Sequence, residues 1–207
     1  MSKIFGISGA QGAGKSTLLN ELETKYGYHV DKFKVSRAVQ KQLGWETLDR
    51  VMDNPTSMMA FQEEVLNQKN IRDFELKGGS DEIVLTERTF ADIFAYAKSW
   101  ATKFKTLDQM TRHEHDDFVR KFFKKAYEAQ HEIYAGTILL PYMSHMVWEE
   151  DPNRASLSDV NSVYWDAYYL ADQVAISSSR HNFVITEETV EARAKQVHEY
   201  LSIQRRK

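Results

Sequence analysis

Short apolar runs alternate along this chain with longer segments in which apolar residues recur every three or four positions. Runs of the first kind predict strands, and segments of the second kind predict amphipathic helices. The strands are predicted at residues 3–8, 28–35, 82–86, 136–140 and 182–186, and the helices at about 15–25, 36–43, 57–76, 90–102, 114–130, 159–175 and 189–203. Because this alternation is typical of parallel β-α units, we expect an α/β fold.

Two of the predicted strands differ in character. The third, residues 82–86, is nearly all apolar, as expected for a strand that is buried on both faces of a parallel sheet. The second, residues 28–35, is interrupted by Asp31, Lys32 and Lys34, which indicates a short strand or one at the edge of the sheet.

Composition narrows the class of protein. The chain has 207 residues, 42% of them apolar, with a formal net charge of −3 and no cysteine. This length fits one domain over residues 1–207, and the lack of cysteine excludes disulfides, thiolate zinc sites and cysteine nucleophiles. We find neither a signal segment nor an apolar run of membrane-spanning length, so we expect a cytoplasmic protein with no membrane partner.

The segment expected to carry the chemistry is Gly9-Ala10-Gln11-Gly12-Ala13-Gly14-Lys15-Ser16. It matches the pattern G-x-x-x-x-G-K-[ST], follows a predicted strand and opens a predicted helix. Its glycines let backbone N–H groups converge on phosphate oxygens, and the helix N-terminus adds partial positive charge. Lys15 is expected to reach the β- and γ-phosphates and the Ser16 hydroxyl to ligate magnesium. Thr17 is included among the binding residues, with a simple helix-start residue as the alternative. The sequence therefore predicts an ATP site with Mg²⁺.

A phosphate-binding loop alone does not separate a kinase from a GTPase, a motor or a transporter subunit. The chain has no Asn-Lys-x-Asp guanine signature and no second nucleotide motif, and its length leaves little room for motor or partner domains. A small kinase fits these observations best.

Beyond this loop, the chain resembles the P-loop nucleoside and nucleotide kinases, especially a group of AAA-type kinase domains from bacteria and phages. This group is similar to nicotinamide riboside kinase and to deoxynucleotide kinases. The resemblance spans almost the whole chain and rests on GAQGAGKST, VLTERT, YAKSW, LLPY and the late pair Asp151 and Arg154. It implies a P-loop NTPase three-layer sandwich, with a five-stranded parallel sheet in the order 2-3-1-4-5 and a helical lid region at about residues 144–158.

The resemblance also implies roles for residues around the loop. Glu87 is expected to orient or deprotonate the acceptor hydroxyl or to hold magnesium, and Arg88 to bind acceptor phosphate or stabilise the transferring group. Arg154 is the expected lid arginine on the phosphates, and Asp151 positions it or binds substrate. The alternatives are a surface ion pair that caps a helix for Glu87 and Arg88, and a simple turn for the stretch around Asp151.

Other polar residues are assigned less directly. Arg37 is expected to contact acceptor phosphate, with a solvated helix-start residue as the alternative. Relatives often carry a glutamate slightly before this arginine, whereas this chain has Lys34. The identity of the general base therefore stays open between Glu87 and Asp31. Asp31 is also expected to bind the substrate. Asp92 is interpreted as a solvated helix residue, with an auxiliary acidic role as the alternative.

The stretch Thr186-Glu187-Glu188-Thr189, at the exit of the fifth strand, is expected beside the adenine. The alternative is that this stretch caps the following helix, and the same residues can do both.

These features predict an ATP-dependent kinase whose acceptor is a nucleoside or a (deoxy)nucleoside monophosphate. One alternative acts on a hydroxyl of DNA or RNA, although a net charge of −3 does not suggest an extended positive groove. The other alternative is a non-catalytic ATP-sensing module. The acceptor base and sugar and the oligomeric state, including a homodimer, stay open.

Overall fold

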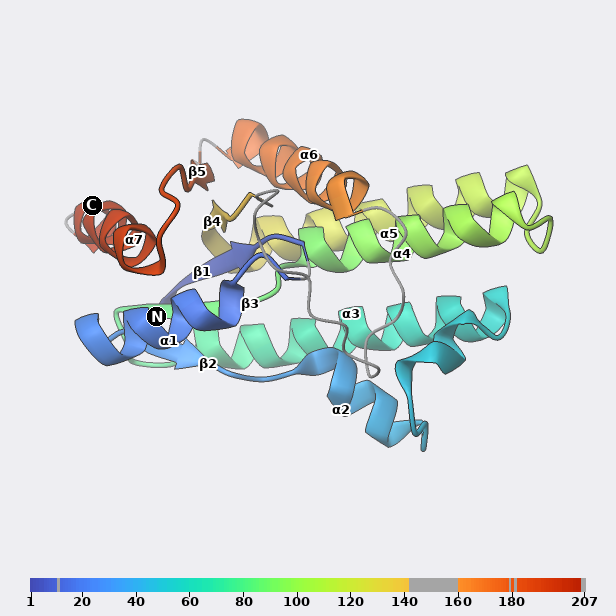
Figure 1. The fold of residues 1–207 in the computed structure, drawn as a ribbon, viewed down its shortest axis with the longest axis horizontal. Coiled ribbons are helices and arrows are strands. Elements are labelled where there is room, and N and C mark those ends of the chain that lie inside the picture. Colours follow the sequence, from blue (N-terminus) through green and yellow to red (C-terminus); the bar gives the residue numbers. More distant parts are fainter. Residues whose placement is uncertain (11, 142–159, 179, 181, 206–207) are drawn as a thin grey trace.

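The structure is a computed structural model that describes residues 1–10, 12–141, 160–178, 180 and 182–205. Within this part of the chain, five strands form one sheet: β1 (Lys3–Ser8), β2 (His29–Asp31), β3 (Ile83–Glu87), β4 (Tyr134–Leu139) and β5 (Asn182–Val184). The strand order is β2-β3-β1-β4-β5 and each neighbouring pair is parallel, which confirms the predicted fold class and order (Figure 1).

Helices cover both faces of the sheet (Figure 1). They are α1 (Lys15–Tyr26), α2 (Val35–Gln42), α3 (Pro55–Lys77), α4 (Phe90–Thr106), α5 (Arg112–Ile133), α6 (Val160–Ser178) and α7 (Val190–Arg205), with a short 3₁₀ helix at Leu48–Met52. On one face lie α1 and α7, and on the other lie α3, α4, α5 and α6, so the architecture is a three-layer sandwich. No described helix is both long enough and apolar enough to cross a membrane.

The two faces of the sheet bury separate apolar cores. In β3, Val84 packs into the core beneath α3 to α6, whereas Ile83 and Leu85 pack into the core beneath α1 and α7. In β4, Leu139 packs into the core beneath α3 to α6 and Ile138 into the core beneath α1 and α7. Successive side chains of a strand point to opposite faces, so a continuous apolar run fills both cores at once.

The second strand is shorter than the pattern suggested. β2 ends at Asp31 and lies at the edge of the sheet, and Lys32 and Lys34 beyond it are exposed. The prediction of a strand over residues 28–35 was therefore too long, while the expectation of a short edge strand is confirmed.

Close packing of α4 against β1 brings the start of this helix to the phosphate-binding loop. A Cβ on Gly6 would lie 2.4 Å from the Thr89 Cγ2, so only glycine leaves room for this approach. The predicted lid region at about residues 144–158, with Asp151 and Arg154, and the loop residue Gln11 lie outside the described residues.

Candidate active site

The phosphate-binding loop connects β1 to α1 through glycines in conformations that other residues rarely adopt. Gly12 and Gly14 have φ angles of 81° and 85°, and α1 starts directly afterwards at Lys15. At Gly9, a Cβ would lie 2.6 Å from the Leu140 carbonyl oxygen. The glycine spacing of the motif therefore has a steric cause in this fold, and it leaves α1 with its N-terminus open to an anion.

Lys15 lies folded over this loop. Its Nζ donates hydrogen bonds to the carbonyl oxygens of Gly9 at 2.6 Å and Ala10 at 2.8 Å, and the residue is only 6% exposed. Burial, followed by the positive charge of Arg88, lowers the pKa of Lys15 from 10.5 to about 8. A phosphate at this position would supply the negative charge that the buried ammonium lacks.

Ser16 and Glu87 meet at the carboxyl edge of the sheet. The Ser16 hydroxyl lies 3.1 and 3.0 Å from the two carboxylate oxygens of Glu87. Burial by itself raises the pKa of Glu87, but the hydrogen bond from Lys34 and the charges of Lys34, Lys15 and Arg88 outweigh it, so the pKa is lowered. Glu87 is therefore an anionic carboxylate beside the loop, and it accepts hydrogen bonds from Ser16 at the start of α1 and from Lys34.

These oxygen groups fit a magnesium ion. Mg²⁺ prefers oxygen ligands and usually keeps waters and substrate phosphates in its shell, so it needs few groups from the protein. In the described part of the chain no three His, Asp or Glu side chains gather into a metal site. A metal at Ser16 and Glu87 would therefore have to share its shell with phosphate and water.

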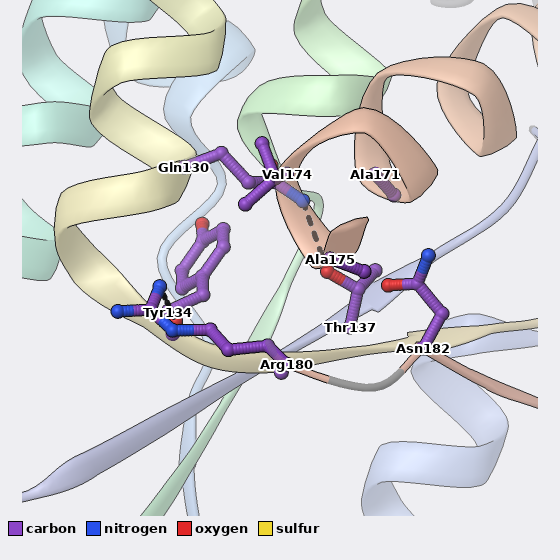
Figure 2. A pocket seen from close by; sticks show the side chains of 9 residues that line it. Gln130, Tyr134, Thr137, Ala171, Val174, Ala175, Arg180 and Asn182 are labelled. Carbon is purple, nitrogen blue, oxygen red and sulfur yellow. Dashed lines mark hydrogen bonds between the residues drawn. The ribbon is translucent and has the colours of Figure 1, made fainter. Parts of the chain in front are cut away.

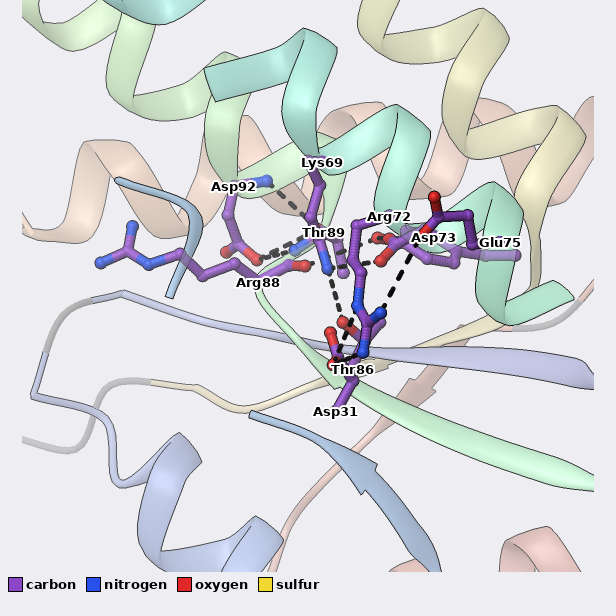
Figure 3. Close-up of polar contacts among 10 residues, drawn as sticks. Asp31, Lys69, Arg72, Asp73, Glu75, Thr86, Arg88, Thr89 and Asp92 are labelled. Carbon is purple, nitrogen blue, oxygen red and sulfur yellow. Dashed lines mark hydrogen bonds and ion pairs between the residues drawn. The ribbon is translucent and has the colours of Figure 1, made fainter. Parts of the chain in front are cut away.

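Arg88 has an unusual backbone conformation. Its φ angle is 64°, in the left-handed region that costs a non-glycine residue of order 1–2 kcal/mol. The guanidinium lies 4.8 Å from the centre of the Tyr96 ring and extends away from the buried side chains of Lys69 and Asp73 (Figure 3). Because of this turn, the side chains of Glu87 and Arg88 point to different places at the carboxyl edge of the sheet.

An aromatic series continues from Arg88 into the layer formed by α3 and α4. Tyr96 lies 6.1 Å from Trp100, Trp100 lies 6.2 Å from Phe61, and Phe61 stacks on Trp45 at 5.5 Å. The Trp100 indole N–H in this series is buried and has no hydrogen-bond partner among the described residues. Phe61, Tyr96 and Trp100 are at most 7% exposed and belong to the core beneath α3 to α6, so this series leads from Arg88 into the core.

Asp92 was wrongly interpreted as a solvated residue, because it is 0% exposed. One carboxylate oxygen accepts hydrogen bonds from the Ser8 hydroxyl and the Gly9 N–H, both at 3.0 Å. The other accepts from the Thr89 N–H at 2.7 Å and closes a capping box at the start of α4. Asp92 therefore ties the start of α4 to the entrance of the phosphate-binding loop.

Replacing Asp92 with alanine is expected to lower the free energy of unfolding by about 2–3 kcal/mol and to weaken the binding of ATP analogues, because the Gly9 N–H loses its partner. Glu114→Ala is the matched control, because Thr111 and Glu114 form the same capping box on α5, exposed to solvent. Denaturant unfolding and calorimetric titration of both variants measure the two effects. Equal losses of stability and affinity in the two variants would contradict the proposed link to the loop.

The remaining candidate residues are placed as follows. Asp31, at the end of β2, is buried and accepts a hydrogen bond from the Arg72 Nη2 at 2.9 Å (Figure 3). It therefore has a structural partner on α3, whereas Glu87 contacts the loop residue Ser16. Arg37 lies exposed in the first turn of α2, and Thr17 lies exposed in the first turn of α1.

Pattern reasoning missed Arg193 on α7. This residue is 2% exposed, and its Nε donates to the Glu187 carbonyl at 2.8 Å while its Nη1 lies 3.5 Å from the Ala13 carbonyl. It thus joins the segment after β5, where the adenine was expected, to the phosphate-binding loop. Thr189 accepts from the Ala192 N–H at 3.2 Å, so the helix-cap reading of this segment is confirmed.

A separate hollow lies between β4, α5 and α6 (Figure 2). Gln130, Tyr134, Thr137, Val174, Arg180 and Asn182 are among its lining residues. Its volume of about 190 Å³, solvent at the mouth included, is below the roughly 300–1,000 Å³ of ordinary ligand pockets. It contains none of the predicted site residues and is too small for a nucleoside.

The fold and the edge formed by Lys15, Ser16, Glu87 and Arg88 define a P-loop protein with a kinase-like α/β fold. A family model described as an AAA domain matches residues 5–193, and the chain belongs to that family. This match bears out the AAA-type domain that the predicted resemblance named. A comparison with curated protein sequences finds no match.

Solved structures with the same fold include two nucleotide-binding proteins. A deoxyadenosine kinase from M. mycoides with dCMP and dCDP bound has a TM-score of 0.60 at 15% identity, over 97% of this chain and 99% of that chain. The NadR protein in complex with NAD and AMP-PNP has a TM-score of 0.55 at 16% identity, over 97% of this chain and 50% of that chain. At these identities the likeness shows the fold alone.

Proposed function

We propose that this protein is an ATP-dependent kinase that transfers the γ-phosphoryl group to a nucleoside or a (deoxy)nucleoside monophosphate. The observation that carries the proposal is the juxtaposition of Lys15 on the loop with Ser16, Glu87 and Arg88 at one edge of the sheet. Ligands of open parallel sheets bind outside the carboxyl ends of the strands. Proteins of similar fold, a deoxyadenosine kinase solved with dCMP or dATP and the NadR protein solved with AMP-PNP, bind nucleotides, which supports a nucleotide ligand for this chain.

On this proposal, the chain contributes mainly position and charge. Lys15 neutralises the transferring group, and Arg88 holds the acceptor near it or stabilises charge on the phosphoryl oxygens. Mg²⁺, held by Ser16 and Glu87, would neutralise the donor phosphates when bound. Phosphoryl transfer requires little proton abstraction before the transition state, so an anionic Glu87 of lowered pKa suits a role in orientation better than a role as a strong base.

The acceptor side fits a nucleoside. Arg88 offers a cation for an acceptor phosphate, and Trp45, the partly buried end of the aromatic series, offers a ring against which a base can pack.

A panel of ribo- and deoxyribonucleosides and their monophosphates, each incubated with γ-labelled ATP and Mg²⁺, tests the proposal. We expect label to transfer to at least one member, with Lys15→Met as the inactive control. Transfer only to oligonucleotides would favour the nucleic-acid kinase instead. Binding of ATP without transfer to any acceptor would favour the ATP-sensing module.

A further inference from the structure

Lys34 directly precedes α2, and its side chain reaches the carboxyl edge of the sheet. Its Nζ donates to the Glu87 carboxylate in a close ion pair and lies 3.4 Å from the Ser16 Oγ. The Lys34 side chain is 49% exposed, whereas that of Glu87 is 13% exposed. An ammonium that enters from the solvent side thus contacts the same two oxygen groups that fit a magnesium ion.

Two cations cannot both use Glu87 as their nearest anion at this position, because their mutual repulsion is strong at such short range. The Lys34 ammonium is carried on a flexible four-carbon stem, and its partial exposure lets it withdraw into water at little cost. Lys15 differs, because it is buried and held by two carbonyl oxygens of its own loop. Of these two lysines, Lys34 is therefore the one whose side chain can leave the site.

We propose that Lys34 is a displaceable counter-ion of the metal site. In the nucleotide-free protein it neutralises the largely buried Glu87 and hinders the entry of a free divalent cation. With nucleotide phosphate oxygens as further ligands, Glu87 would hold the metal after the Lys34 ammonium has withdrawn into solvent. Metal binding thereby becomes conditional on nucleotide. The inference rests on the proposed function only for the location of the metal at Ser16 and Glu87.

The test measures metal binding without nucleotide, with Mn²⁺ as a paramagnetic probe followed by electron paramagnetic resonance. Lys34→Met is expected to bind Mn²⁺ about tenfold more tightly than the wild-type protein, because the competing charge is gone. Lys32→Met is the matched control and should bind as the wild type does. Lys32 is an exposed lysine of the same segment whose Nζ pairs with Glu23 at 2.5 Å, away from the site.

A second variant tests whether the tighter Mn²⁺ binding depends on Glu87. The double variant Lys34→Met/Glu87→Gln is expected to lose the gain, because Glu87 is the anion that the metal would use. Equal or weaker Mn²⁺ binding in a folded Lys34→Met protein, checked by circular dichroism, overturns the inference. The proposed function fails on a different result, the absence of transfer in the nucleoside panel, and the nucleotide-free titration does not depend on that outcome.

Discussion

Replacing Lys15 with methionine is expected to reduce phosphoryl transfer by about a thousandfold or more and to leave the fold intact. The Lys15 ammonium is the cation carried by the loop itself, and electrostatic stabilisation of this kind accounts for factors of that size. Methionine preserves the length and apolar character of the side chain, so α1 keeps its packing. The measurement is single-turnover transfer from labelled ATP to the best acceptor of the nucleoside panel.

The same substitution is expected to stabilise the protein near neutral pH. Burial lowers the pKa of Lys15 from 10.5 to about 8, so between these values the unfolded chain binds more protons than the folded one. The stability of the wild-type protein therefore rises with pH across this window relative to the variant. At pH 7 the variant should be more stable by at most about 3 kcal/mol, and the difference should vanish above pH 10.5.

Lys25→Met is the control for both effects, because Lys25 lies in the last turn of the same helix and pairs with Glu191 on α7. It should retain full activity and show no pH-dependent gain in stability over this window. Undiminished transfer by Lys15→Met would contradict the assignment of the loop as the phosphate site.

The phosphate-binding loop was predictable from sequence because its chemistry is local. The spacing of its glycines, Lys15 and Ser16 encodes a turn and a helix start within a few residues, and the structure contains both. The strand order, in contrast, came from the family resemblance, since hydrophobic periodicity does not specify which strands are neighbours.

The interpretation of Asp92 failed because its partners are distant in the sequence. The pattern Thr89-x-x-Asp92 is a readable capping signature, but its contact with Gly9 depends on how closely α4 approaches β1. That approach requires Gly6, where a side chain would collide with Thr89. Arg193 was missed because an arginine in an amphipathic helix normally indicates a solvated face.

A buried ion pair on α3 could not be predicted from periodicity either. Lys69 and Asp73 are both 0% exposed, and the Lys69 Nζ donates to Asp73 at 2.9 Å and to the Thr86 hydroxyl at 2.5 Å (Figure 3). The Tyr134 hydroxyl donates to the other oxygen of Asp73 at 2.5 Å and lies 3.5 Å from the Arg88 carbonyl oxygen. This cluster joins α3, β3 and β4 directly behind the strained turn at Arg88.

Replacing Lys69 with methionine is expected to lower the free energy of unfolding by about 3–5 kcal/mol, because it leaves the Asp73 carboxylate buried without its cation. Burial already raises the pKa of Asp73, against the opposing influence of Lys69 and Tyr134, and removal of the lysine should raise it further. A raised pKa in the folded state means that the folded protein binds more protons, so the loss should grow as the pH rises above 3.8. Denaturant unfolding at pH 5 and pH 8 measures both effects.

The matched control is Lys195→Met, since Lys195 and Glu199 have the same spacing on α7 but are 71% and 64% exposed. An exposed pair of this kind contributes about 0–1 kcal/mol to stability, so Lys195→Met should lose much less free energy of unfolding than Lys69→Met. In the double variant Lys69→Met/Asp73→Asn the buried charge is gone, and part of the stability should return. Equal small losses for Lys69→Met and Lys195→Met would show that the cluster does not hold α3 to the sheet. A large loss at Lys69 alone would indicate that the cluster stabilises the packing of α3 on β3 and β4.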